Sequence, residues 1–171
     1  MDGKIAFTAS LTVASGLLVA GAGEALAARC TLIIGASENP PVVSEGRGRF
    51  LINRTAPDTL TYRLRYNIPD ANVTQAHVHI ANPGNNGGIA AFLCGGGGAQ
   101  DCPTPSGIVE DELGVDDVSG VQDEETGNTI IEDGDLDGLF RLIRDGATYV
   151  NVHTVDHPSG EIRCQINPRI R

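Results

Sequence analysis

The segment from Leu60 to Ile68 alternates between apolar and polar side chains over its whole length. Apolar residues occupy every second position, and Thr61, Arg63, Arg65 and Asn67 stand between them. Successive side chains of a β-strand point to opposite faces of its sheet. The pattern therefore predicts a half-buried antiparallel strand, with one face in a core and the other in solvent.

Several other short segments have strand character and are separated by turn sequences. Pro57 and Asp58 form the tip of a predicted hairpin that joins residues 48–54 to residues 60–68. Further strands are predicted within residues 29–37, 75–80, 89–94, 148–155 and 160–166. About seven short strands with turns between them, and almost no helix, predict an all-β fold, an antiparallel β-sandwich.

Residues 135–145 are the predicted exception, a single short helix. Their apolar residues at positions 136, 139, 140 and 143 follow helical spacing, while Asp135 can cap the start and Gly146 can end the helix. Residues 133–138, which overlap the start of this segment, match the first half of a calcium-loop pattern, but Arg144 stands at the twelfth position, where such a loop needs a glutamate. The helix is therefore favoured over a calcium site.

The first 27 residues resemble a secretory signal peptide. Lys4 supplies a positive charge, an apolar run from Ile5 to about Ala22 follows, and residues 25–27 form a small-x-small cleavage site. An uncleaved membrane anchor is the alternative, but the run contains Ser and Thr and lacks dense Leu and Ile. We therefore expect residues 1–27 to be removed, and residues 28–171 to form one secreted, periplasmic or cell-surface domain without a membrane span.

The charge distribution bears on the choice of partner. The chain has a formal net charge of −10 and no cluster of basic residues along its sequence. These features disfavour nucleic acid and anionic membranes as partners. Between about residues 95 and 133 the strand pattern disappears and acidic residues become dense, so this acidic insert is predicted to be a solvated excursion from the sandwich.

All four cysteines lie after the predicted signal peptide, in a chain expected to meet an oxidising compartment. Cys94 and Cys102 flank a flexible seven-residue spacer that easily closes a loop, which leaves Cys30 to pair with Cys164. The second bridge would stabilise the fold by about 4 to 5 kcal/mol on the chain-entropy estimate. A four-cysteine zinc site is the alternative, but the spacings are not CxxC pairs.

His77 and His79 are separated by one residue in a predicted strand, so both imidazoles share one face. His153 lies in a later predicted strand, on the face opposite to Val150 and Val152. Imidazole nitrogens suit copper and zinc, and three of them leave an open coordination position. These three histidines are therefore candidate ligands of one ion.

His157, in the turn after the last of these strands, is a candidate fourth ligand or simply a turn residue. The alternative for the whole set is that the histidines hydrogen-bond across neighbouring strands and position the turns. The chain has no GxSxG signature and no phosphate-binding loop. No catalytic residue is therefore assigned.

Three blocks of sequence resemble the chordin-type (CHRD) domain family. They are "GASENPPVVSEGRGRF", "AHVHIANPGNNGGIAAFL" and "LFRLIRDGATYVNVHTVDHPSGEIRCQI", in the order of the family, and the resemblance as a whole extends over nearly all of residues 30 to 166. The resemblance implies one extracellular β-sandwich, of a kind that in chordin belongs to a protein that binds growth factors. The chain departs from the usual pattern in its acidic insert and in Cys164, where the family commonly has Gly.

The "HVH" strand is also similar to the copper-binding strand of copper-zinc superoxide dismutase, in which a further copper histidine comes from a late strand. Together the two resemblances imply an antiparallel Greek-key sandwich, immunoglobulin-like or superoxide-dismutase-like. They also imply that the strand of His77 and His79 lies beside that of His153, with the three histidines on the outer face. The bridging and zinc ligands of the dismutase have no counterpart here.

Three functions follow from these observations. The favoured one is an exported CHRD binding module that holds one copper or zinc ion, with an extracellular or envelope protein as its partner. The second is a small copper oxidoreductase that resembles superoxide dismutase. The third is a structural surface domain without a ligand.

Overall fold

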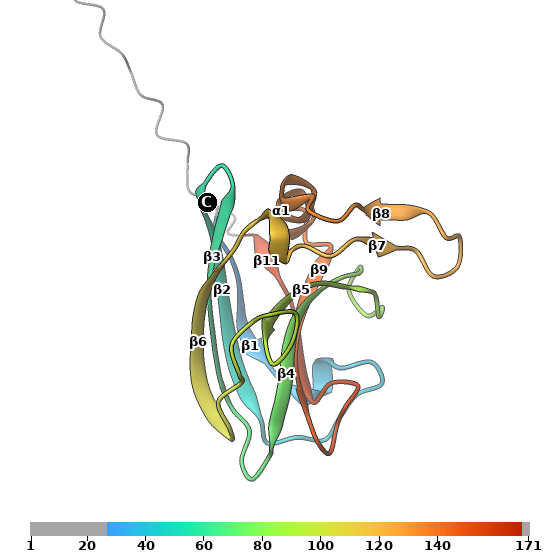
Figure 1. The fold of residues 1–171 in the computed structure, drawn as a ribbon. Coiled ribbons are helices and arrows are strands. Elements are labelled where there is room, and N and C mark those ends of the chain that lie inside the picture. Colours follow the sequence, from blue (N-terminus) through green and yellow to red (C-terminus); the bar gives the residue numbers. More distant parts are fainter. Residues whose placement is uncertain (1–26, 169–171) are drawn as a thin grey trace, which may run out of the picture.

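The alternating segment forms β3 (Thr59–Asn67), which lies between two other strands of a five-stranded sheet. All of its predicted core side chains are buried, at 5% exposure or less. The structure is a computed structural model and describes residues 27–168 (Figure 1). The strand character read from the alternation is therefore confirmed.

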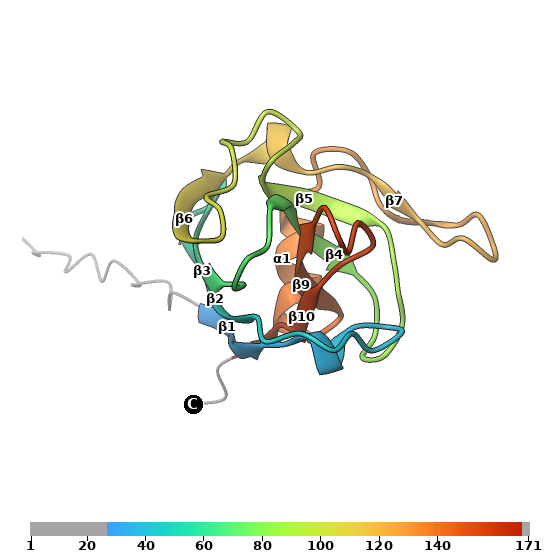
Figure 2. The ribbon, with the colours of Figure 1, turned by 90° about the horizontal axis from the view of Figure 1, so that it is seen from below.

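Two antiparallel sheets form the layers of a sandwich, which Figure 2 shows from below. The first sheet has the order β11-β1-β2-β3-β6, with β1 (Ala27–Ile33), β2 (Arg47–Ala56), β6 (Ser106–Leu113) and β11 (Asn167–Pro168). The second has the order β10-β9-β4-β5, with β4 (Val73–Ile80), β5 (Ile89–Cys94), β9 (Thr148–Thr154) and β10 (Ile162–Gln165). The predicted all-β sandwich is confirmed.

The core lies between the two sheets. Phe50 and Leu64 fill it from the first sheet, and Val78, Leu93 and Val150 fill it from the second, each at 2% exposure or less. Two 3₁₀ turns, η1 (Gly35–Ser37) and η2 (Val115–Asp117), lie in the connections. The outward face of the second sheet carries histidines and that of the first sheet carries arginines. Both candidate sites lie on these faces.

The predicted helix is present as α1 (Leu136–Arg144), the single α-helix of residues 27–168. The Asp135 carboxylate accepts a hydrogen bond of 2.7 Å from the backbone N–H of Gly138 and so caps the first turn. Leu139 and Ile143 are buried, and Gly146 follows the helix with a φ of +76°. The helix and both of its predicted ends are confirmed.

Two disulfides join the pairs that the sequence favours. Cys30 of β1 is bonded to Cys164 of β10, with their Cα atoms 6.1 Å apart, so this bridge connects the two sheets. Cys94 is bonded to Cys102, with a Cα separation of 5.1 Å, and closes the glycine-rich loop that follows β5.

The acidic insert is only partly an excursion, which corrects the prediction. Residues 106–113 form β6, which pairs with β3 from Ser106 to Leu113. The strand was missed because it lies at a sheet edge and buries only Val109 and Leu113 between exposed acidic residues. The later part does leave the body: β7 (Val121–Gln122) and β8 (Thr129–Ile131) form a projecting two-stranded hairpin (Figure 1).

The predicted signal peptide lies outside the described residues and stays a prediction. Within residues 27–168, no helix combines the length and apolar character that crossing a membrane requires.

Candidate metal centre

Strands β4 and β9 lie side by side in the second sheet, as the resemblances implied. In their antiparallel register, Val78 faces Val150, His77 faces Asn151 and Gln75 faces His153. Residues that face each other across a strand pair point to the same side of the sheet. His77 and His153 are therefore diagonal neighbours on the side away from the sandwich core.

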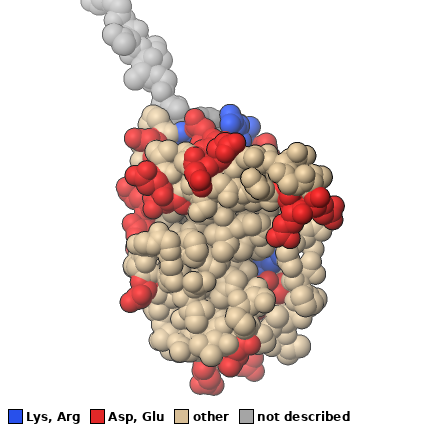
Figure 3. Space-filling model, turned by 45° about the vertical axis from the view of Figure 1, so that its right-hand side comes forward, with Lys and Arg blue, Asp and Glu red and all other residues tan. Residues whose placement is uncertain are grey.

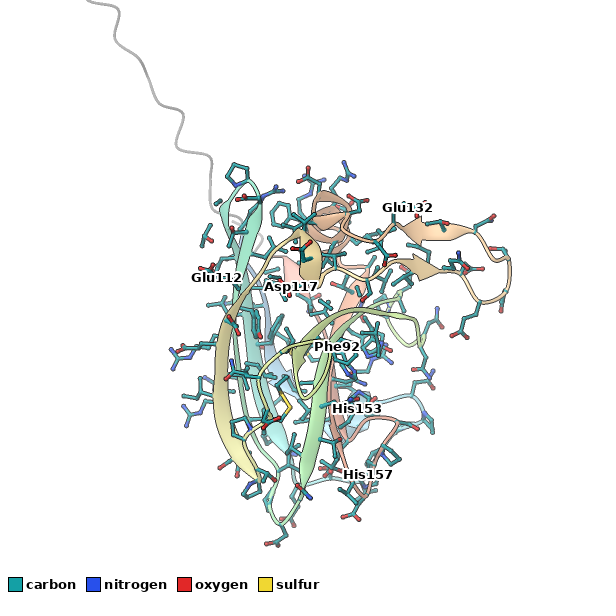
Figure 4. All side chains as sticks on the ribbon, in the orientation of Figure 1. Phe92, Glu112, Asp117, Glu132, His153 and His157 are labelled. Atoms are coloured by element: carbon teal, nitrogen blue, oxygen red, sulfur yellow. A yellow bond between two sulfur atoms is a disulfide. The ribbon has the colours of Figure 1, made fainter. Side chains whose placement is uncertain are left out.

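The three histidines of β4 and β9 converge at one place, and we call them the histidine cluster: His77, His79 and His153. One ring nitrogen from each lies within 4.8 Å of the others. His77 Nδ1 is 3.1 Å from His153 Nε2, and the His77 and His79 rings are 5.3 Å apart at their centroids. His157 is not brought into this group; it lies in the turn after β9, where its backbone N–H donates to Thr154 (Figure 4).

The histidine cluster is buried, whereas the sequence predicted a solvent-exposed face. His77, His79 and His153 are exposed by only 2%, 7% and 8%. The Phe92 ring of β5 packs edge-on against His77 at 4.6 Å, and the Tyr149 ring stacks on His79 at 4.7 Å with an interplanar angle of 2°. The three histidines do lie on the side of the sheet away from the core, as predicted, but aromatic rings and loops cover that side.

Glycine lets the covering loop approach so closely. Gly97 has a φ of +60°, and a Cβ at this position would lie 2.5 Å from the Phe92 ring. A larger residue would therefore be strained and would also push the loop away from Phe92. The Cys94–Cys102 disulfide closes this loop, so the run "CGGGG" packs on Phe92, the ring that covers His77.

Backbone carbonyls hold two of the rings in one tautomer. His79 Nδ1 is 2.9 Å from the Gly87 carbonyl, and His153 Nδ1 is 2.9 Å from the Pro158 carbonyl. A carbonyl oxygen can only accept, so both Nδ1 atoms carry the proton, and in the neutral rings both Nε2 atoms keep a lone pair. His153 Nε2 is also 3.0 Å from the side-chain amide of Asn151, which in this tautomer donates to it through its NH2 group. Metal-binding histidines are oriented in this way by a second hydrogen bond on the other nitrogen.

Two ring nitrogens of the cluster are buried and lack a hydrogen-bond partner among residues 27–168: His77 Nε2 and His79 Nε2. Burial lowers the pKa of His77 to about 3, with the neighbouring histidines adding to the effect, and lowers that of His79 to about 4. Burial also lowers the pKa of His153. All three imidazoles are therefore neutral at neutral pH, the state in which histidine binds metals.

Arg163 of β10 holds the turn that positions His79. Its side chain is only 2% exposed, and its guanidinium donates to the Asn85 carbonyl at 2.5 Å and to Asn86 Oδ1 at 2.9 Å. Gly87, the next residue, supplies the carbonyl that fixes His79. The guanidinium thus orders the turn from which this ligand candidate takes its orientation.

The same guanidinium also supports Tyr149. The Arg163 Cζ atom lies 3.4 Å from the centroid of the Tyr149 ring, whose other side stacks on His79. Cation–π contact and stacking together fix the His79 ring between the turn and this support.

Arg163→Lys is expected to lower the free energy of unfolding by about 2 kcal/mol, because an ammonium group cannot reproduce the planar fork that bonds both turn residues. Urea denaturation at pH 7 measures the change, and Arg141→Lys on the exposed side of α1 is the matched control. Equal stability of the two variants would show that the hydrogen bonds from Arg163 to the turn do not stabilise the fold.

Glu38 is a further buried titratable group, at 7% exposure. Burial raises the pKa of its carboxyl to about 7, although the positive charge of Arg163 acts in the opposite direction. Its Oε1 atom has no hydrogen-bond partner among residues 27–168. The carboxyl therefore takes up a proton close to neutral pH.

Sequence reasoning missed Phe92, Arg163 and Glu38. Phe92 sits in the apolar run "IAAFLC", which predicts a strand but not which of its residues faces the histidines, and β5 is bulged against β4. Arg163 did carry a signal, because it alternates with Ile162 and Cys164 on a core strand. Glu38 lies in a proline-rich connection and appeared only as part of the first CHRD-like block, with no sign of its burial.

The fold and the site define a disulfide-bonded antiparallel β-sandwich with a buried three-histidine cluster on the outer side of one sheet. Comparison with known protein families matches residues 31–166 to the CHRD domain, so the chain belongs to the CHRD domain family. No curated protein and no solved structure matches it.

Proposed function

We propose that this chain is an exported CHRD binding module that holds one copper or zinc ion through His77, His79 and His153. The observation that carries the proposal is the convergence of three neutral imidazoles, with two Nε2 atoms buried and unpartnered within residues 27–168. A buried polar atom without a partner costs about 1 to 3 kcal/mol. A bound ion would remove this cost at whichever of these nitrogens it ligates.

The donor set fits these two metals. Imidazole is a common ligand of zinc and copper, and zinc–nitrogen bonds are about 2.0 to 2.1 Å long. Two nitrogens on one such ion are at most about 4 Å apart. The separation of 3.1 Å between His77 Nδ1 and His153 Nε2 is therefore compatible with a shared ion.

Burial favours an ion that is held over one that turns over a substrate. A catalytic metal needs an open position that its substrate can reach. Rings that are at most 8% exposed leave little room for such access. This observation supports the binding module over the copper oxidoreductase, and family membership in the CHRD domain supports it as well.

Export is part of the proposal. Two disulfides and the signal-like sequence of residues 1–27 both support an oxidising compartment. The partner proposed for the module is an extracellular or envelope protein, and nucleic acid is not expected.

Metal titration of the untagged protein, purified in chelator and then freed of it, tests the proposal. We expect one copper or zinc ion per chain, and His77→Ala should weaken the affinity by at least about 100-fold, since even residues that only orient ligands contribute 10- to 100-fold. His157→Ala is the matched control and should bind like the unaltered chain. Circular dichroism checks the fold, because His77 is buried, and His153→Asn provides a second ligand variant.

The absence of stoichiometric binding would contradict the proposal and favour a structural domain without a ligand. An equal loss of affinity in His157→Ala would show that the ion is bound elsewhere.

A further inference from the structure

The first sheet collects arginines on its outward side. Five of the chain's twelve basic residues lie on β1, β2 and β3 with exposed side chains, and we call this surface the arginine face: Arg29, Arg47, Arg49, Arg63 and Arg65. No basic cluster is visible along the sequence, because the strand register brings these residues together. The folded protein thus has a basic surface although its sequence has no basic cluster.

The register places like charges directly opposite each other. Arg49 of β2 faces Arg65 of β3, and Arg63 faces Leu51, which in turn faces Arg29 of β1. Neighbouring strands are about 4.8 Å apart, and like charges at opposed positions destabilise a sheet. The pair of Arg49 and Arg65 is therefore an arrangement that an anion would stabilise.

Most of these charges are not neutralised within residues 27–168. Arg63 forms an ion pair of 3.1 Å with Glu110 of β6, whereas Arg29, Arg47, Arg49 and Arg65 form none. An open hollow of about 460 Å³ lies on the same surface. Its lining includes three of the guanidinium-bearing residues, Arg47, Arg49 and Arg65, together with Leu32 and Asn67.

The arginine face contrasts with the rest of a chain whose net charge is −10. Acidic residues dominate the charged groups of the opposite side, which Figure 3 brings forward. In Figure 4, nitrogen-tipped side chains project from the first sheet away from the sandwich. The exposed arginines of β1, β2 and β3 therefore form a basic surface on an otherwise acidic protein.

The neighbours of the arginines restrict the kind of polyanion. The aromatic residues of β2 and β3 are Phe50, Tyr62 and Tyr66, and all are buried in the core, so these strands offer no ring on which a nucleic-acid base could stack. Exposed Glu110 and Glu112 on the adjacent β6 would repel a broad anionic surface such as a bilayer.

Neutral polar side chains complete the face. Asn53, Thr61 and Asn67 lie on the same side of β2 and β3 as the arginines and can exchange hydrogen bonds with hydroxyl groups. Arginine presents a planar fork of donors that matches carboxylate and sulfate groups. We propose that the arginine face binds an extended acidic polysaccharide that carries carboxylate or sulfate groups.

Binding of the full chain to dextran sulfate, and to the carboxylated polymer alginate, tests this proposal at several salt concentrations, with neutral dextran as the blank. Arg49→Thr/Arg65→Thr should weaken binding by about 10-fold or more, because two forked contacts are lost. Arg141→Thr/Arg144→Thr on α1 is the control with the same change in charge and should weaken it far less. Thermal unfolding of the first variant should occur at an equal or higher temperature, since a repulsive pair is removed.

Three further polyanions test whether the face prefers a polysaccharide. Duplex DNA, polyglutamate and phosphatidylglycerol vesicles, compared at equal charge concentration, should bind at least 10-fold more weakly than the better polysaccharide. Equal or tighter binding of any of these would overturn the assignment to a polysaccharide. Equal losses in the two arginine double variants would overturn the assignment to this face.

Discussion

Replacing Cys30 and Cys164 by alanine is expected to lower the free energy of unfolding by about 5 kcal/mol, the chain-entropy estimate for a loop of this length. The bridge spans a sequence separation of 134 residues and joins β1 of one sheet to β10 of the other. Without it the unfolded chain gains freedom, and the two layers are held by packing and by hydrogen bonds such as that from the Tyr62 hydroxyl of β3 to the Leu93 carbonyl of β5. Urea denaturation at pH 7 under non-reducing conditions measures the difference.

The second disulfide provides the comparison. Cys94 and Cys102 are separated by 8 residues, so their replacement by alanine should cost only about 2.5 kcal/mol on the same estimate. Equal losses for the two pairs would contradict the loop-length argument. Peptide mapping of the unaltered protein under non-reducing conditions checks the pairing itself, and a fragment that links Cys30 to Cys94 would show the assignment to be wrong.

Acidification from pH 7 to pH 4 in the presence of chelator is expected to lower the free energy of unfolding by about 3 kcal/mol or more. The pKa values of His77 and His79 fall from 6.5 to about 3 and about 4 in the folded state. Below pH 6.5 the unfolded chain therefore takes up protons that the native chain cannot. Their contribution to stability is fully present above pH 6.5 and is lost as the pH decreases toward 4.

Glu38 acts in the opposite direction. Its folded pKa of about 7 lies above the ordinary value of 4.5, so the native chain binds its proton first as the pH decreases. Its contribution is present below pH 4.5 and is lost as the pH rises toward 7, which offsets about one histidine. The lowered pKa of His153 adds to the loss on the acid side.

Urea denaturation at pH 7, 6, 5 and 4 measures this dependence. His79→Phe should flatten the slope because it removes one buried titrating group. His157→Ala should keep the slope, since this histidine lies outside the cluster. A stability that is independent of pH in the unaltered chain would contradict the buried, neutral state of the histidine cluster.

Most of the architecture could be predicted from local patterns. The alternation in residues 60–68 and the caps Asp135 and Gly146 of α1 depend on neighbours within a few positions, and all three are confirmed. β6 was missed because an edge strand with acidic outward residues does not show a continuous apolar face. Such an edge strand can be recognised only from the strand with which it pairs, and the sequence does not show this pairing.

The candidate site was predictable in its residues but not in its surroundings. The spacing of His77 and His79 fixes their common face, and family resemblance supplied the neighbouring strand of His153. The burial of the cluster comes from Phe92 and from loops distant in sequence, so alternation alone could not reveal it. The arginine face could not be predicted for a similar reason, since only the strand register brings Arg49 and Arg65 together.

The loop over Phe92 affects the rate at which a bound ion would exchange, rather than the affinity for it. Phe92 packs against His77 and the segment of residues 95–101 packs on Phe92, so movement of this segment would loosen the cover of an ion held by the histidine cluster, and the Cys94–Cys102 bridge limits how far it can move. Local opening of this kind sets the rate at which buried groups meet solvent. Such an ion would have a residence time governed by the loop, and exchange would be faster in any compartment that reduces the bridge.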